Sequence, residues 1–233
     1  MKLSKLALVL SFITANILIF SSCKNSDSPA SGPSLTTESI TIENSSFESP
    51  TTPNDSFITT APPTSWTAYG AINNNNRSVG VLNPNATTLY LDPVPHGFNV
   101  GVTFLMDNAG NQLQFNNSPA GMEQTLTAQL QLNSKYTLTT YVGNLGPGSP
   151  PPPFQFTGFP NYRIELLAGG VVIVQDSNTL LPGEGRFLIS TLVVDILSTH
   201  PQAGQNLGIR LINLNSAVGI EVNFDRLTLI RQF

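Results

Sequence analysis

Cysteine, histidine and charge are all scarce in this 233-residue chain. It has one cysteine and two histidines, and only 10% of its residues are charged. A single cysteine excludes a disulfide within the chain, and two distant histidines supply too few ligands for a zinc site. The HExxH, Gly-x-Ser-x-Gly and phosphate-binding glycine motifs are also missing. Carboxylates, tyrosines and the shape of a pocket therefore remain as candidate chemistry.

Basic residues are in the minority. Ten Lys and Arg residues stand against fourteen Asp and Glu residues, which gives a formal net charge of −4. A surface of this sign repels phosphate groups, and no Lys/Arg stripe runs through the sequence. Nucleic acid is therefore excluded as a partner.

Helix signals are weak, whereas strand signals are frequent. Eighteen prolines and eighteen glycines disfavour helices, and residues 136–142 and 207–212 alternate with the period of a strand. Two apolar runs, 162–167 and 171–176, flank a Gly-Gly pair that suits a tight hairpin. The sequence predicts an all-β fold: a two-sheet antiparallel β-sandwich, or jelly roll, with about ten to twelve short strands. Further strands are expected at 38–43, 79–82, 87–91, 99–106, 112–116, 122–132, 186–195 and 219–231, with a second hairpin turning at 107–111.

The N-terminus resembles a bacterial lipoprotein signal peptide. Lys2 and Lys5 precede a short apolar run, and Cys23 follows small residues. The resemblance implies a signal peptide at 1–22, a lipidated Cys23 on a flexible Ser/Pro-rich tether at 23–37, and a single β-sandwich domain at 38–233. It places the domain in the bacterial cell envelope, anchored to a membrane by lipid and facing the periplasm or the cell exterior. The alternative is an ordinary signal peptide with a chance cysteine.

Two distant acids follow phenylalanines near the two ends of the predicted domain. Glu48 comes after the first predicted strand, and Asp225 lies within the last one. The first and last strands of a sandwich often lie side by side, so these carboxylates could share a calcium ion that replaces the missing disulfides. The alternative is that both acids are solvated surface residues.

Landmarks along the domain resemble carbohydrate-binding-module-like, or galactose-binding-like, jelly rolls. They are Asn44–Pro50, Ser65-Trp66, Gln124–Leu126, Tyr136–Leu138 and Phe224–Leu229. The resemblance implies that Glu48 and Asp225 hold a structural Ca²⁺.

A narrower resemblance is to the Stig cyclases, the hapalindole-type indole alkaloid cyclases. It rests on Lys135–Asn144, Phe159–Gly169 and Leu207–Asn213. It implies a Cope rearrangement with cyclisation in an aromatic-lined pocket, with an acidic side chain as proton donor. Asp225 and Asn223 share a strand face, so the catalytic position falls on one of them, and at Asn223 the acid would be replaced. The tyrosine that the resemblance leads us to expect within 99–104 is missing.

Four aromatic residues are candidates for ligand contact, namely Trp66, Tyr141, Phe159 and Tyr162. Trp66 could be a sugar-stacking platform or a core residue, and alternation explains Tyr162 equally well as core packing. The function expected first is an envelope-anchored lipoprotein whose calcium-stabilised domain binds a glycan or a small apolar molecule. The alternative is a Stig-cyclase-like enzyme, and a third possibility is a structural or protein-binding surface lipoprotein.

Overall fold

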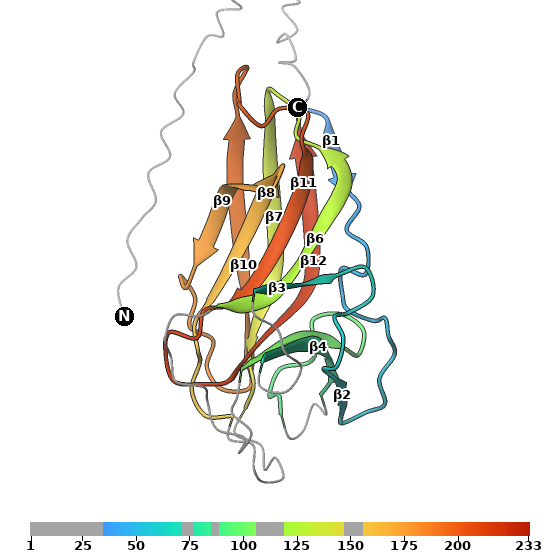
Figure 1. Cartoon of the computed structure of the whole chain (residues 1–233), viewed down its shortest axis with the longest axis vertical. Helices are drawn as coiled ribbons and strands as arrows, with labels where there is room; N and C mark the ends of the chain where they lie inside the picture. The colour runs from blue at the N-terminus through green and yellow to red at the C-terminus, as the bar shows by residue number, and fades with distance from the viewer. Residues whose placement is uncertain (1–34, 71–76, 85–88, 106–118, 147–155) are drawn as a thin grey trace, which may run out of the picture. The chain divides into compact units, whose positions relative to one another are not determined.

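The computed structural model describes five stretches of the chain, namely residues 35–70, 77–84, 89–105, 119–146 and 156–233. They form one compact unit, Leu35–Phe233 (Figure 1). The expected signal peptide, Cys23 and most of the tether lie outside the described residues, as do the expected hairpin turn at 107–111 and the strand at 112–116. In the parts of the chain that the structure describes, no helix is long and apolar enough to cross a membrane.

In the described residues, twelve strands form two antiparallel sheets, which confirms the predicted all-β sandwich. The seven-stranded sheet has the order β10-β7-β12-β5-β4-β2, with β1 also paired to β12. Its strands are β1 (Thr37–Ile40), β2 (Ser56–Ile58), β4 (Arg77–Asn83), β5 (Val100–Leu105), β7 (Ser134–Asn144), β10 (Arg186–Ile196) and β12 (Glu221–Gln232).

The five-stranded sheet has the order β3-β6-β11-β8-β9. Its strands are β3 (Thr67–Gly70), β6 (Ala120–Gln129), β8 (Tyr162–Ala168), β9 (Val171–Ser177) and β11 (Asn206–Asn213). The predicted hairpin is β8–β9, and Gly169 and Gly170 turn it with φ of 59° and 79°, values that residues other than glycine rarely adopt. The strand predicted at 87–91 is wrong for 89–91, which are irregular.

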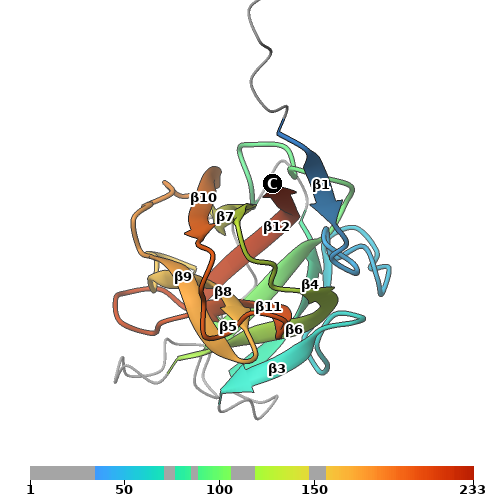
Figure 2. The ribbon, with the colours of Figure 1, turned by 90° about the horizontal axis from the view of Figure 1, so that it is seen from above.

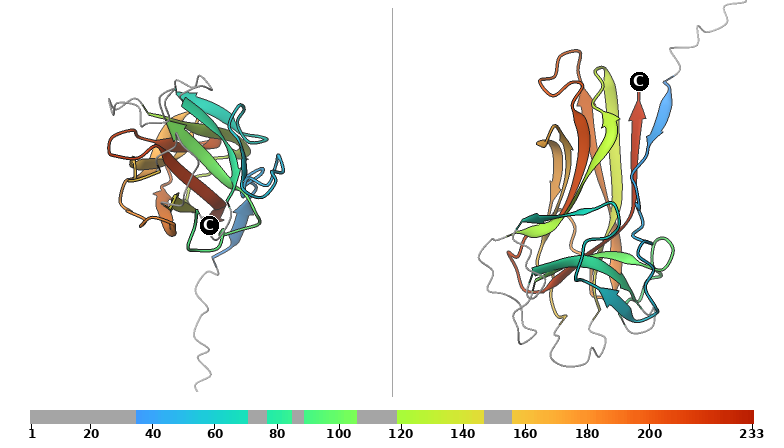
Figure 3. Two further views of the ribbon diagram at one scale, coloured as in Figure 1. Left: turned by 90° about the horizontal axis from the view of Figure 1, so that it is seen from below. Right: turned by 45° about the vertical axis from the view of Figure 1, so that its right-hand side comes forward.

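The two ends of the domain lie side by side. β1 pairs antiparallel with β12, with Thr37 opposite Gln232 and Ile40 opposite Leu229. Figures 1 and 2 show β1 next to the C-terminus, and the right-hand view of Figure 3 shows the same arrangement. The domain therefore begins and ends at the same end of the sandwich.

Two apolar clusters flank the seven-stranded sheet. The main core lies between the sheets and includes Phe47, Leu138, Val222 and Phe224, all fully buried. A second cluster packs on the opposite face of the same sheet, because alternate residues of a strand point to opposite sides. Its buried members are Leu82, Tyr90, Val100, Val102, Phe104, Leu145, Phe187 and Ile220.

A buried carboxylate ties the two sheets together along one side of the sandwich. Asp176 of β9 accepts hydrogen bonds from the hydroxyl groups of Tyr162, Ser190 and Thr179, and from the Thr179 amide. Ser190 belongs to β10 of the other sheet, so the contact spans the sandwich. Burial alone would raise the pKa of Asp176, but these donors outweigh it and lower the pKa. The Asp176 network supplies a cross-sheet connection in a domain without a disulfide.

Candidate functional site

A row of three polar side chains lies on the face of β12 that is turned away from the main core. Val222 and Phe224 belong to the main core, so Glu221, Asn223 and Asp225 point to the other face. All three are buried, with exposures of 7%, 0% and 0%. The β12 register shifts directly after Asp225, as in a β-bulge, and this ends the row.

Hydrogen bonds connect Glu221, Asn223 and Tyr90. The Tyr90 hydroxyl donates a short hydrogen bond to Asn223 Oδ1. Asn223 Nδ2 in turn donates to Glu221 Oε1 over 2.6 Å. The amide therefore connects a phenol and a carboxyl group across the surface of the sheet.

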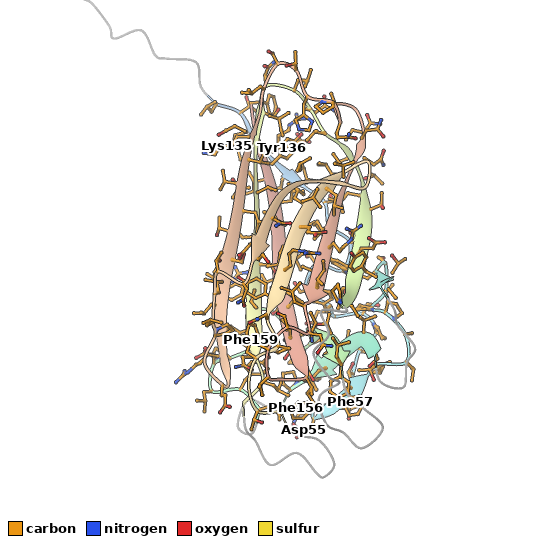
Figure 4. All side chains as sticks on the ribbon, turned by 60° about the vertical axis from the view of Figure 1, so that its left-hand side comes forward. Asp55, Phe57, Lys135, Tyr136, Phe156 and Phe159 are labelled. Carbon is orange, nitrogen blue, oxygen red and sulfur yellow. The ribbon has the colours of Figure 1, made fainter. Side chains whose placement is uncertain are left out.

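The second apolar cluster surrounds this chain of hydrogen bonds. The Phe187 ring stacks on Tyr90 with a centroid distance of 4.2 Å and an interplanar angle of 17°. Phe104 packs 6.2 Å from Phe156, and Tyr141 is half-buried against the same cluster. Figure 4 places Phe156 near one end of the sandwich and Tyr136, close to the start of β7, at the other. The site therefore lies far from the end where β1 and the C-terminus meet.

The apolar surroundings change the acid–base properties of the row. Burial raises the pKa of Glu221 to about 7, although the hydrogen bond from Asn223 opposes the shift. Burial also raises the pKa of Tyr90 well above its usual value, and the nearby carboxylates Glu221 and Asp225 add to this rise. Glu221 can therefore carry a proton near neutral pH, while Tyr90 stays a hydrogen-bond donor.

Gly143 of β7 makes room for the Tyr90–Phe187 stack. It lies opposite Asn223 in the β7–β12 register. A Cβ atom at this position would lie 2.5 Å from the Phe187 ring and 2.6 Å from the Tyr90 hydroxyl oxygen. A side chain as small as alanine would thus displace one of these rings.

Asp225, at the other end of the row, faces Glu48. Its Oδ2 accepts the His96 amide hydrogen at 2.8 Å, while its Oδ1 accepts that of Arg226. Burial raises its pKa to about 8, the two amide donors oppose this rise, and the negative charge of Glu48 adds to it. Glu48 Oε1 accepts the amide hydrogens of Phe98 and Asn99. The structure thus brings the two carboxylates predicted to share calcium into electrostatic contact.

Asn99, whose backbone amide donates a hydrogen bond to Glu48, also carries an unpartnered side-chain oxygen. The Asn99 side-chain amide donates to the Phe47 and Pro50 carbonyl oxygens, which fixes its orientation. Its Oδ1 is buried and has no hydrogen-bond partner. Two carboxylates and a free amide oxygen are donors of the kind that Ca²⁺ prefers, so the residues present fit this cation. The described stretches contain no group of three or more His, Cys, Asp and Glu side chains that could hold a metal ion, and this site offers two carboxylates and an amide oxygen.

The four predicted ligand-contacting aromatic residues separate into two groups. Trp66 is 5% exposed, packs 5.3 Å from Phe47 and donates its indole N–H to the Asn44 carbonyl oxygen, so it is a core residue and not a stacking platform. Tyr162 is fully buried in the main core and bonded to Asp176, which also corrects its prediction as a ligand contact. Phe159 lies half-buried beside Tyr162, against the main core. Of these four residues, only Tyr141 packs against the second cluster.

Sequence reasoning missed Glu221, Tyr90 and Phe187. The alternation that placed Asn223 and Asp225 on one face also includes Glu221, so this signal was available. Tyr90 comes from an irregular segment, where periodicity does not specify side-chain direction.

Comparison with known proteins points to one family. The profile of the HpiC1-like family, described as HpiC1 cyclase, matches residues 38–230. A crystal structure of a cyclase from Fischerella sp. TAU is 34% identical, with a TM-score of 0.75, over 84% of this chain and 98% of that chain. No curated protein sequence matches the chain.

Two similar structures contain indole compounds. The Stig cyclase Fisc from Fischerella sp. TAU, in complex with (3Z)-3-(1-methyl-2-pyrrolidinylidene)-3H-indole, is 35% identical, with a TM-score of 0.74, over 84% of this chain and 98% of that chain. A cyclase from the same organism, in complex with 4-(1H-indol-3-yl)butan-2-one, is 35% identical, with a TM-score of 0.75, over 83% of this chain and 97% of that chain. The chain belongs to the HpiC1-like cyclase family.

Proposed function

We propose that this protein is a cyclase-type enzyme that acts on a small, apolar, indole-bearing molecule, with Glu221 as its proton donor. The observation that carries the proposal is the hydrogen-bonded row of Tyr90, Asn223 and Glu221 within an apolar, aromatic cluster. The indole compounds held by related cyclases support the substrate class. We therefore favour an enzyme over the binding module that the sequence suggested first.

The geometry suggests how each group contributes. Glu221 Oε1 accepts the Asn223 amide hydrogen, so Oε2 is the oxygen that carries the proton. A neutral carboxylic acid in apolar surroundings can donate this proton to a substrate atom that becomes more negative as bonds rearrange. The rearranged cation then returns a proton to the carboxylate, so the acid is restored and the product is an isomer of the substrate. The Tyr90 hydroxyl holds the Asn223 amide in the orientation that faces Glu221. Phe187 and Tyr141 supply aromatic surface that folds an apolar substrate into a compact shape.

Binding and turnover should be measured separately. The binding probe is 4-(1H-indol-3-yl)butan-2-one, and the turnover assay follows conversion of an alkenyl-substituted indole into an isomer of unchanged mass. Glu221→Gln should bind the probe normally while turnover falls by about 10²–10⁴-fold, the usual contribution of a general acid. Glu184→Gln, a change at an exposed loop acid, should leave both unchanged. Full turnover by Glu221→Gln would exclude Glu221 as the proton donor. Tight binding of the probe by the wild-type protein without any isomerisation would favour the binding module.

We also propose that Glu48, Asp225 and the Asn99 amide oxygen hold a structural calcium ion. The support is the electrostatic contact between the two acids together with the unpartnered Asn99 Oδ1. Such an ion would join the segment after β1 to the middle of β12, two parts of the chain that are distant in sequence. It would stabilise the domain without taking part in proton transfer.

Lipid attachment at Cys23, with envelope localisation, remains a prediction from the leader sequence. Metabolic labelling with an alkyne-bearing fatty acid in a bacterial host should label the protein, and Cys23→Ser should abolish the label. A labelled Cys23→Ser protein, or an unlabelled wild-type protein, would count against it.

A further inference from the structure

Four large apolar side chains are exposed at the end of the sandwich where the domain begins and ends. They are Leu35, Leu132, Leu197 and Phe233, with exposures of 70%, 37%, 70% and 47%. They come from four separate segments, namely the residues before β1, the β6–β7 turn, the β10–β11 connection and the residue after β12. These four residues together are named the apolar tip.

Strand register shows that the four segments meet at one end of the sandwich. One row of paired residues crosses β1, β12, β7 and β10, and it consists of Thr37, Gln232, Lys135 and Asp195. Each member of the apolar tip lies beyond this row, within three residues of one of its members. Figure 4 shows Lys135 and Tyr136 at this end and Phe57 and Phe156 at the other.

The apolar tip lies in an uncharged surface. Asp, Glu, Lys and Arg are all missing from its four segments, 35–37, 130–134, 196–206 and 232–233. Charged residues lie directly behind these segments. Lys135 is paired opposite Asp195, and Arg231 forms an ion pair of 2.8 Å with Glu38. Apolar side chains in front of a charged border suit the headgroup region of a bilayer, where the apolar groups leave water and the charges stay in it.

Exposed apolar side chains at the opposite end stand next to charges. Phe57 is exposed two residues after Asp55, and Leu91 is exposed directly before Asp92. Asp92 also forms an ion pair with Arg186. To bury Leu91 in a membrane would bring this ion pair out of water, which is costly. The apolar tip carries no such cost.

We propose that the apolar tip docks on the surface of a lipid bilayer, with Leu35, Leu197 and Phe233 in the headgroup region. The choice of a bilayer over a protein partner rests on the predicted lipid at Cys23. Thr36 and Phe233 exchange two backbone hydrogen bonds, of 3.0 and 3.1 Å, so the chain that leads back to Cys23 leaves the domain at the apolar tip. A lipid twelve residues before Leu35 would hold this surface near the membrane, and the high effective concentration strengthens a weak contact.

The absence of charge predicts which lipids the apolar tip binds. A basic surface needs anionic lipids and loses affinity as salt is added. The apolar tip has no such requirement, so it should bind vesicles of phosphatidylcholine alone. Added salt should leave this binding unchanged.

Vesicle sedimentation tests the docking on residues 23–233 with Cys23→Ser, a form without leader or lipid that contains all twelve described strands. This parent protein should sediment with phosphatidylcholine vesicles. Leu35→Gln/Leu197→Gln should lower its partition coefficient by about tenfold or more, because two leucine side chains no longer leave water. Leu181→Gln is the matched control, because Leu181 is 69% exposed in the β9–β10 connection at the opposite end, and it should bind as the parent does.

The orientation is tested with an environment-sensitive fluorophore on a single cysteine in the same parent protein. On Ser198→Cys, next to Leu197, the emission should shift to the blue when vesicles are added. On Glu184→Cys, an exposed position just before β10 at the opposite end, it should not. The proposal is overturned if the parent protein does not bind vesicles, if Leu35→Gln/Leu197→Gln binds as well as the parent, or if both fluorophores shift equally. Fatty-acid labelling of Cys23 is a separate measurement, so failure of the lipid prediction and failure of the docking surface can be told apart.

Discussion

Asp176 and Glu221 are both buried carboxylates, yet their surroundings differ in the number of hydrogen-bond donors. Asp176 accepts four hydrogen bonds and has a lowered pKa, whereas Glu221 accepts one hydrogen bond from Asn223 and its pKa rises to about 7. Burial acts in the same direction on both groups, so the donors decide the outcome. A carboxylate with enough donors serves as a permanent anion that connects strands. A carboxyl group with few donors in apolar surroundings keeps its proton up to about neutral pH, so it can serve as a proton donor there.

The largest expected effect on stability comes from Asp176→Asn. The change removes the charge from an acceptor of four hydrogen bonds, so we expect the free energy of unfolding to fall by about 3 kcal/mol. Glu221→Gln should leave stability at pH 8 unchanged or improved, because it removes a carboxylate that ionises in apolar surroundings. Urea denaturation measures both. An equal loss of stability in the two variants would contradict the contrast between the two carboxylates.

Calcium binding by Glu48 and Asp225 should have the next largest effect on stability. With calcium at about 100 times its dissociation constant, binding to the folded state alone adds about 2.7 kcal/mol. The melting temperature should therefore rise with calcium and fall with a chelator. Glu48→Gln should lose most of this response, while Glu43→Gln, at an exposed acid close in sequence, should keep it. An identical response in all three proteins would place the ion elsewhere.

Gly143→Ala should disturb the region of Glu221 and leave that of Asp176 intact. The added methyl group would overlap Phe187 and the Tyr90 hydroxyl, so we expect a loss of about 2 kcal/mol and weaker binding of the indole ketone. Gly183→Ala is a control, because the nearest atom to its Cβ is Arg186 Cγ at 3.8 Å. Calorimetric unfolding and binding titration test both variants. Unchanged probe binding by Gly143→Ala would argue against an indole site beside Tyr90 and Phe187.

The smallest effect concerns pH, where the two carboxylates should act with opposite sign. Asp176 has a lowered folded-state pKa, so its stabilisation is present above its unfolded pKa and is lost as pH falls through the folded value. Glu221 has a raised pKa, so the folded state binds more protons than the unfolded state between about 4.5 and 7, and stability falls as pH rises through that window. Glu221→Gln should flatten the second slope and Asp176→Asn the first. Melting curves from pH 3 to pH 8 would show whether each slope disappears with its own variant.

Much of the fold could be predicted from the sequence, because alternating residues report directly on strands. The β8–β9 hairpin and the pairing of the chain ends followed from Gly169-Gly170 and from the positions of the first and last strands. The short strands β2 and β3 were missed, since three or four residues give no clear period.

The candidate site was only partly predictable, and for a different reason. Alternation placed Asn223 and Asp225 correctly on one face, but it could not find Tyr90, which reaches Asn223 from an irregular segment 133 residues away in sequence. Trp66 and Tyr162 show the converse difficulty. Composition cannot tell an aromatic ring that packs in a core from one that contacts a ligand.

The pairing of β1 with β12 separates the start of the domain from the proposed indole site. Glu221 begins β12 and Gln232 ends it beside Thr37, a separation of about 35 Å at roughly 3.3 Å per residue. A lipid on Cys23 would hold the domain by the end that carries Thr37. The proposed indole site lies toward the opposite end of the domain, so an anchor of this kind would leave the site uncovered and open to substrate.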